Sequence, residues 1–185
     1  DLVLIDAGAE YRNYAADITR TFPVNGRYTR EQRALHDLVG AAQAAALACA
    51  RPGVAFAALH ETVVEVLGEG LLRLGLLKGS LEKCIAGEHY RQFYRHKSGH
   101  WLGLDVHDVG DYRIDGQSRL LEPGMVLTIE PGLYVGADDT SVAAKWRGIG
   151  IRTEDDVLIT ADGHRVLTEG LARSADEIEA FMAGR

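Results

Sequence analysis

Hydrophobic residues recur every three to four positions in two stretches of the chain, a spacing typical of amphipathic helices. The first stretch opens with Thr29 and Gln32, which form a T-x-x-Q capping box, and runs to about Ala50. The second begins near Phe56 and ends before Gly75. The pattern therefore predicts two consecutive helices, each with one apolar face to bury.

Shorter apolar runs predict strands. The first two, 3–5 and 18–22, are separated by a polar connection whose turn residue is Asn13, so they predict a hairpin. Residues 96–108 mix three histidines with glycines and predict a strand with a turn around it.

A second hairpin is predicted later in the chain. Residues 125–129 form a buried strand that ends at Pro131, and 146–151 are expected to pair with 157–160. A further capping box predicts a short helix over 174–182. Helices between strands of this kind indicate one α+β domain over 1–185, with the helices on the outer face of a curved antiparallel sheet.

The two hairpins carry carboxylates at matching positions. In each one an apolar strand leads into a carboxylate and then a glycine, with Asp6 in the first and Glu130 in the second. Each is followed by a strand with another carboxylate, Asp17 or Glu154. Burying an acid at the end of an apolar strand is costly unless positive charge meets it. Four such acids at mirrored positions predict a shared pair of divalent cations.

His100 adds an imidazole to this set. Alone, a histidine in a glycine-flanked strand is more often a core residue than a ligand, but its occurrence with the four acids favours a ligand. Carboxylate-rich sites with one imidazole suit Mn(II), Co(II) or Zn(II). Two such ions, bridged by a hydroxide, form a clamp for the hydrolysis of a carbonyl or phosphoryl group.

Composition narrows the possible functions. The formal net charge of −7 argues against a nucleic-acid surface, and no apolar run approaches the roughly 20 residues of a membrane span. Cys49 and Cys84 lack C-x-x-C spacing and are interpreted as reduced thiols of a cytoplasmic protein.

The internal repeat also predicts that something precedes the chain. Two helices and a histidine-bearing strand, roughly 100 residues, stand before the second hairpin. If the first hairpin is built alike, a comparable unit belongs before Asp1. We therefore expect a larger catalytic domain of which this chain is the C-terminal part.

Five motifs, in order, resemble those of the pita-bread metallopeptidases, a family that includes Xaa-Pro aminopeptidase (aminopeptidase P), prolidase and methionine aminopeptidase. The resemblance is to the Xaa-Pro aminopeptidases in particular and covers essentially the whole chain. The motifs are L-I-D-A-G-A-E-Y, Y-A-A-D-I-T-R-T-F-P-V-N-G, S-G-H-W-L-G-L-D-V-H-D-V-G, E-P-G-M-V-L-T-I-E-P-G-L-Y and G-I-G-I-R-T-E-D-D.

The resemblance implies a pita-bread fold that is incomplete at its N-terminus and a dinuclear metal site. The ions are usually manganese in this family. Asp17 and Glu154 would bridge the two ions, Asp6 would hold one of them, and His100 and Glu130 the other.

The resemblance also implies roles in catalysis and substrate binding. A hydroxide between the ions would attack the scissile carbonyl, with Glu130 shuttling its proton. His107 would contact the substrate carbonyl and stabilise the tetrahedral intermediate. His96 would line the proline pocket, and Tyr134 and Arg152 would shape the substrate site.

The other titratable residues near these motifs are expected to play no direct part. The histidines expected on the surface or in helices are His36, His60, His89 and His164. Asp105 and Asp108, which flank His107, are expected either to lie in a turn or to support neighbouring site residues rather than to bind metal. Asp155 and Asp156 are expected at a solvated strand end.

The function expected from the resemblance is hydrolysis of the N-terminal Xaa-Pro bond of peptides with proline at position 2. Prolidase, which cleaves Xaa-Pro dipeptides on the same scaffold, remains an alternative, as does a non-catalytic pita-bread domain that binds peptides or proteins. The complete protein is expected to form a homo-oligomer. The upstream residues are expected to come from the same protein or from another copy of the chain.

Overall fold

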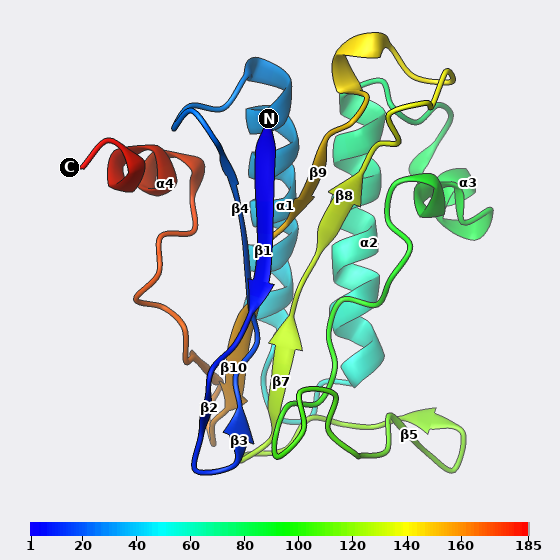
Figure 1. Cartoon of the computed structure of the whole chain (residues 1–185). Helices are drawn as coiled ribbons and strands as arrows, with labels where there is room; N and C mark the ends of the chain where they lie inside the picture. The colour runs from blue at the N-terminus through cyan, green and yellow to red at the C-terminus, as the bar shows by residue number, and fades with distance from the viewer. Residues whose placement is uncertain (185) are drawn as a thin grey trace.

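The computed structural model describes residues 1–184, in which a bent antiparallel sheet carries two long helices on one face (Figure 1). The helices are α1 (Arg30–Cys49), α2 (Phe56–Arg73), α3 (Leu81–Ala86) and α4 (Ala175–Met182), with the 3-10 turns η1 (His89–Gln92) and η2 (Ala144–Trp146). The strands are β1 (Leu2–Ala7), β2 (Glu10–Tyr11), β3 (Tyr14–Ala15), β4 (Ile18–Pro23), β5 (Arg113–Ile114), β6 (Gln117–Ser118), β7 (Val126–Ile129), β8 (Gly132–Tyr134), β9 (Gly150–Arg152), β10 (Asp155–Ile159) and β11 (His164–Val166).

The first hairpin has the predicted form. β1 and β4 pair antiparallel, and Asp6 lies opposite Thr19. At the far end β2 and β3 continue the hairpin to a two-residue turn, where Arg12 and Asn13 have φ of 52° and 68°. Asparagine tolerates this left-handed conformation better than most residues, so the turn forms where the sequence indicates.

The second hairpin differs from the prediction. β9 pairs with β8, not with β10, and β10 pairs with both β7 and β11. β7 and β8 are two parts of one strand that breaks at Glu130 and Pro131, and β9 and β10 break at Thr153 and Glu154. Because proline has no N–H to donate, the ladder is interrupted there, and the long hairpin bends at that point.

The segment over 96–108 was predicted to be a strand and is irregular instead. It contains a single bridge, Trp101 with Leu127, although backbone N–H groups of β7 still reach its carbonyls, as Thr128 does to His100. The glycines explain the close approach, because a Cβ on Gly99 would lie 2.0 Å from the carbonyl oxygen of Thr128.

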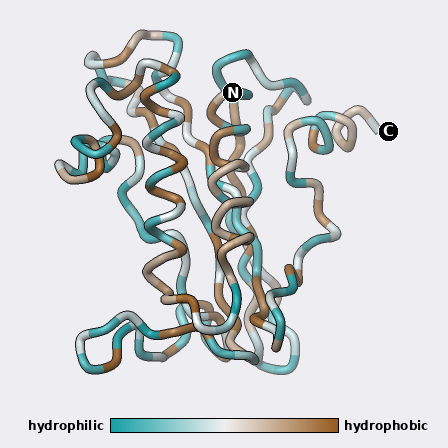
Figure 2. The backbone as a smooth tube through the Cα atoms, turned by 180° about the vertical axis from the view of Figure 1, so that it is seen from behind, coloured by the Kyte–Doolittle hydropathy of each residue, from teal (hydrophilic) through white to brown (hydrophobic). Residues whose placement is uncertain are grey.

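The helix pair forms the core against the back of the sheet (Figure 2). The capping box of Thr29 and Gln32 begins α1 as predicted, and the buried stripe of α1 contains Leu35, Val39 and Ala42. α1 packs against α2 and also contacts β7, β8 and β9. The predicted capping box at Ser174 likewise begins α4.

The outer edge of β1 is open. Among residues 1–184 β1 pairs with β4 alone, and its last residues are exposed, with Ile5 at 48%. No helix in the part of the chain described is both long enough and apolar enough to cross a bilayer.

Candidate metal centre

The breaks in the second hairpin place two glutamates next to each other. Ile129 pairs with Asp155 on one side of the breaks, and Gly132 pairs with Arg152 on the other, so Glu130 and Glu154 lie between these pairs. Their backbones bond to other segments, because Glu130 N–H donates to Ser98 at 2.9 Å and Glu154 N–H donates to Thr19 at 3.0 Å. The backbone bend therefore positions both residues, and side-chain hydroxyls orient their carboxylates, because Thr19 Oγ1 donates to Glu154 and Thr128 Oγ1 donates to Glu130 at 3.4 Å.

The first hairpin supplies two more acids. Asp6 is the penultimate residue of β1, its side chain is 45% exposed, and its carboxylate is paired with the Arg152 guanidinium. Asp17 precedes β4 and is buried, and its N–H donates to Asp156 Oδ2 at 3.2 Å. The two side chains are close enough for Asp6 to raise the pKa of Asp17.

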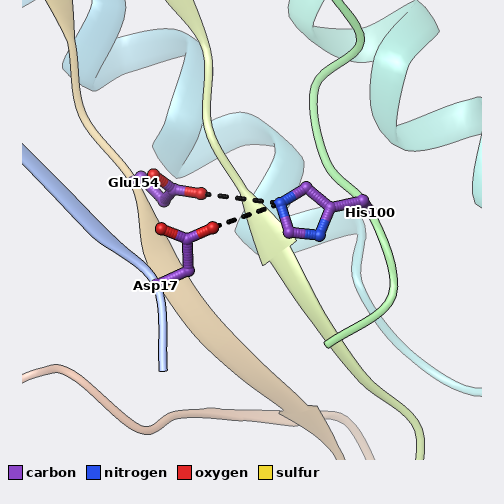
Figure 3. A group of neighbouring side chains, drawn as sticks. All are labelled: Asp17, His100 and Glu154. Carbon is purple, nitrogen blue, oxygen red and sulfur yellow. Dashed lines mark ion pairs between the residues drawn. The ribbon is translucent and has the colours of Figure 1, made fainter. Parts of the chain in front are cut away.

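His100 faces the acids, two of which, Asp17 and Glu154, are drawn with it in Figure 3. Its Nε2 lies 3.4 Å from Asp17 Oδ2, 3.5 Å from Glu130 Oε1 and 4.0 Å from Glu154 Oε1. Ligand atoms of Asp17, His100 and Glu154 all lie within 4.8 Å of one another. The structure thus brings all five predicted ligands to one place, although Asp6 lies at its exposed edge.

The hydrogen bonding of His100 fits a metal ligand. Its Nδ1 lies 3.0 Å from the carbonyl oxygen of Trp101, so Nδ1 carries the proton and donates it there. Nε2 in the neutral ring is then a bare lone pair directed at carboxylates. Metal-binding histidines are commonly oriented by such a backbone acceptor on the other ring nitrogen, and a cation between Nε2 and the acids would satisfy both.

Ionising all of these acids together is unfavourable without a cation. Burial and, to a smaller extent, the neighbouring carboxylates raise the pKa of Glu154 to about 8 and that of Glu130 to about 7. Burial is also the main reason that the pKa of Asp17 is raised. Two divalent cations would reverse this effect and keep the acids ionised, so the residues present fit a divalent metal centre.

A chain of hydrogen-bonded side chains runs beside the acids. Arg152 Nη1 donates to the Tyr134 hydroxyl at 3.1 Å, and that hydroxyl donates to His96 Nε2 at 2.9 Å. His96 Nδ1 donates to the carbonyl of Lys97 at 2.7 Å. Arg152 Nε also donates to Thr19 Oγ1 at 3.1 Å. Three of the four predicted substrate-site residues, Arg152, Tyr134 and His96, are therefore joined in one hydrogen-bonded chain through the Tyr134 hydroxyl.

His107 reaches the same site through the bend after Gly103. The bend is held by Asp108 N–H, which donates to Trp101 at 3.1 Å, and by Ala15 N–H, which donates to Gly103 at 2.8 Å. The ring of His107 stands edge-on to that of His100 with centroids 4.4 Å apart. His107 is exposed, and it lines the same cavity as His100 and Glu130.

These side chains line a cavity of about 870 Å³ that extends beyond the acids. Asp6, His107, Glu130 and Arg152 form one part of its wall. The remaining wall comes from the start of α2 and from the segments around Lys97 and Tyr112, and it includes residues that the sequence analysis did not single out. The volume is in the range of small-molecule and peptide sites.

Asp155 and Asp156 were expected at a solvated strand end, and this is wrong. Both are buried. The Asp155 carboxylate accepts from Arg20 Nη2 at 2.8 Å, from Gln43 Nε2 at 3.0 Å and from Thr168 Oγ1 at 2.6 Å. The partners come from β4, α1 and the C-terminal segment, so no local pattern around the two aspartates reveals them.

Two of the histidines expected on the surface or in helices lie in α1 and α2. His36 is buried on the inner side of α1 against the Tyr28 ring, and burial lowers its pKa to about 4. His60 is half-buried in α2 and lines the cavity, where its Nδ1 lies 2.8 Å from Ser98 Oγ. His60 is thus part of the site region that the sequence motifs did not include.

Comparison with known proteins agrees with this geometry. The model of metallopeptidase family M24 matches residues 1–161. The chain is 52% identical over 182 residues to the Xaa-Pro aminopeptidase of Escherichia coli (strain K12), covering 98% of this chain and 41% of that protein. It is 39% identical over 183 residues to Xaa-Pro aminopeptidase 3 of Rattus norvegicus, covering 99% and 35%.

Solved structures are similar over the whole chain. Pseudomonas aeruginosa aminopeptidase PepP matches with a TM-score of 0.98 at 55% identity, and 100% of this chain covers 42% of that one. Proline aminopeptidase P II from Yersinia pestis matches with a TM-score of 0.96 at 54% identity and the same coverage. The chain therefore spans about two fifths of the length of these relatives. The predicted α+β pita-bread fold is confirmed, and the chain belongs to metallopeptidase family M24.

Proposed function

We propose that the protein carrying this chain is an Xaa-Pro aminopeptidase, which hydrolyses the bond between the first residue of a peptide and a proline at position 2. The observation that carries the proposal is the convergence of Asp17, Glu130 and Glu154 on Nε2 of His100, with Asp6 beside them. The 52% identity to a protein named Xaa-Pro aminopeptidase supports the same reaction.

The metal centre that we propose holds two divalent ions. Asp17 and Glu154 would bridge them, Asp6 would hold one, and His100 and Glu130 the other. Oxygen ligands in this excess favour a hard ion, and we propose manganese over cobalt or zinc. When bound, such ions supply Lewis-acid polarisation of a carbonyl and an activated water.

The chain's own side chains have distinct parts in the reaction. Glu130 lies at the cluster with its backbone fixed by Ser98, so its carboxylate can accept a proton and return it to the leaving proline nitrogen. His107 can donate a hydrogen bond to the oxygen on which negative charge develops. Arg152 and Tyr134 hold His96 in one orientation, which would shape the pocket for the proline ring.

Substrate length separates this proposal from the alternatives. The manganese-loaded full-length protein is expected to cleave Xaa-Pro-Yaa tripeptides with a higher kcat/KM than Xaa-Pro dipeptides, and to lose activity on both with a chelator. Cleavage of dipeptides alone would identify a prolidase. Binding of both peptides without cleavage would identify a non-catalytic pita-bread domain.

We also propose that a further segment of the protein, or a second copy of the chain in a homo-oligomer, covers the open edge of β1. An unpaired edge next to the exposed Ile5 would otherwise favour aggregation. The isolated 185-residue chain is therefore expected to associate in solution and to cleave Xaa-Pro-Yaa more slowly than the full-length protein, with manganese in both. Equal kcat/KM from an isolated chain that sediments as a monomer would show that no such cover is required.

The free thiols of Cys49 and Cys84 suit a reducing compartment, so we propose a cytoplasmic location. Cell fractionation tests this, and recovery of the protein outside the cytoplasmic fraction would contradict it.

A further inference from the structure

His60 stands in the cavity wall with one ring nitrogen bonded and the other open. Its Nδ1 contacts Ser98 Oγ at 2.8 Å, and the same Ser98 oxygen lies 2.6 Å from the Tyr94 hydroxyl. Nε2 of His60 has no hydrogen-bond partner among residues 1–184, and it is not one of their buried unpaired polar atoms. Nε2 therefore faces the cavity that His60 lines.

The buried hydroxyls decide which nitrogen of His60 carries the proton. Tyr94 is 1% exposed and Ser98 is 4% exposed, so both hydroxyl protons need an acceptor within the protein. The Tyr94 hydroxyl can donate only to Ser98 Oγ among the described residues. Ser98 must then donate its own proton to His60 Nδ1, because the reverse arrangement leaves the Tyr94 proton buried without an acceptor.

His60 is consequently a neutral ring with its N–H on Nε2. Burial, with smaller contributions from Lys97, His96 and Arg91, lowers its pKa to about 4, so the ring stays neutral at neutral pH. The Tyr94–Ser98 pair thus converts His60 into a fixed hydrogen-bond donor directed into the cavity.

The position of His60 indicates which part of a peptide it meets. The Tyr94 ring lies between two histidines, with centroids 4.9 Å from His96 and 5.7 Å from His60. His96 in turn has its Nδ1 3.9 Å from Glu130 Oε2. His96 and His60 both line the cavity, and Tyr94 is buried behind them, so His60 lies farther from the acids than His96 does. If His96 borders the proline ring, His60 lies on the side of that ring away from the acids, where the chain after the proline would run.

We propose that His60 is a substrate-binding residue whose Nε2–H donates a hydrogen bond to the carbonyl oxygen of the residue that follows the proline. This inference rests on the proposed Xaa-Pro aminopeptidase function, and it assigns the side of the cavity lined by α2 to the leaving peptide. Phe56 and Tyr112, whose rings lie 5.0 Å apart, form the apolar wall beside it.

Charged side chains near His60 determine the design of the substrates. Lys97 and Arg113 line the same region and would attract a terminal carboxylate, whereas Glu61 would repel it. Substrates that end in an amide have no terminal carboxylate, so these three charged side chains do not affect the comparison. The matched pair is Xaa-Pro-glycinamide and Xaa-Pro-ethylamide, because the ethylamide keeps the chain up to the glycine Cα and lacks the carbonyl that His60 would bind.

The experiment measures kcat and KM for both substrates with the manganese-loaded full-length protein and with His60→Leu, His60→Gln and the exposed control His89→Leu. His60→Leu is expected to lower kcat/KM for the glycinamide about three- to tenfold through KM, the usual worth of one hydrogen bond. The same variant should leave kcat/KM for the ethylamide unchanged. His60→Gln keeps an N–H near the place of Nε2 and should retain most of the affinity, and His89→Leu should change neither substrate.

The ratio between the two substrates is independent of how much of a variant folds. An equal loss on both substrates, a loss in kcat alone, or no rescue by His60→Gln would overturn the inference while leaving the proposed function in place. Failure of the parent protein to cleave either substrate would overturn the proposed function and, with it, the role of His60.

Discussion

Replacement of Asp17 by asparagine is expected to reduce bound manganese below two ions per chain and to abolish most of the peptidase activity. Asp17 is buried, and its carboxylate lies 3.4 Å from His100 Nε2 with Asp6 beside it. An amide of the same shape cannot supply the negative charge that a bridging position needs. The loss in metal affinity should exceed the roughly 10–100-fold cost of removing a residue that merely hydrogen-bonds to a ligand.

Stability distinguishes a ligand from a structural residue at this position. Burial and the Asp6 carboxylate raise the pKa of Asp17 above its ordinary value, so its ionised form destabilises the metal-free protein at neutral pH. Metal-free Asp17→Asn should therefore unfold at the same temperature as the parent or higher, whereas the increase in Tm on adding manganese should shrink. The matched control is Asp138→Asn, which makes the same change in an exposed loop.

The outcome that would contradict the ligand role is full manganese content in Asp17→Asn with a lowered Tm. That result would make Asp17 a structural acid that supports the bend between the hairpins.

His107→Ala is expected to retain its bound manganese and to lose most of its peptidase activity. The His107 ring lies edge-on to His100 at 4.4 Å between centroids, on an exposed bend that faces the cavity. Its loss removes a donor for the developing oxyanion, and kcat should fall by roughly 10²–10⁴, the usual worth of a positioned acid-base or electrophilic group. Metal content per chain, measured by elemental analysis, should stay near that of the parent.

The exposed His89→Ala is the control, since it removes an imidazole outside the cavity. If His107→Ala loses metal and activity to the same extent, His107 is a ligand or a structural residue, and its catalytic role is wrong.

Local signals in the sequence were sufficient for most of the elements. The capping boxes at Thr29 and Ser174 satisfy the first N–H groups of α1 and α4 with neighbouring side chains, and the turn at Asn13 needs only its own backbone preference. The repeated pattern of a strand followed by a carboxylate likewise identifies Asp6, Asp17, Glu130 and Glu154 as candidate metal ligands. This prediction needs no knowledge of the rest of the fold, because the same local pattern occurs twice.

The errors concern contacts between segments that are distant in the sequence. The partner of β9 is β8, since Pro131 divides one strand into two and shifts the pairing by one segment. Asp155 is buried and paired with Arg20 Nη2 at 2.8 Å. Arg20 lies 135 positions away in the sequence, so nothing near Asp155 indicates this partner. His36 lies in a helix, as expected, but helical periodicity does not indicate that the Tyr28 ring packs against it. Periodicity identifies the apolar face of a helix and gives no information on segments that cover its other faces.

Anomalous diffraction from crystals of the manganese-loaded full-length protein tests the metal centre most directly. The account predicts two anomalous peaks about 3.5–4 Å apart. Oxygens of Asp6, Asp17, Glu130 and Glu154 and Nε2 of His100 should lie within coordination distance of these peaks. A single peak, peaks elsewhere in the molecule, or any one of the five side chains turned away from both ions would contradict the five-ligand dinuclear centre.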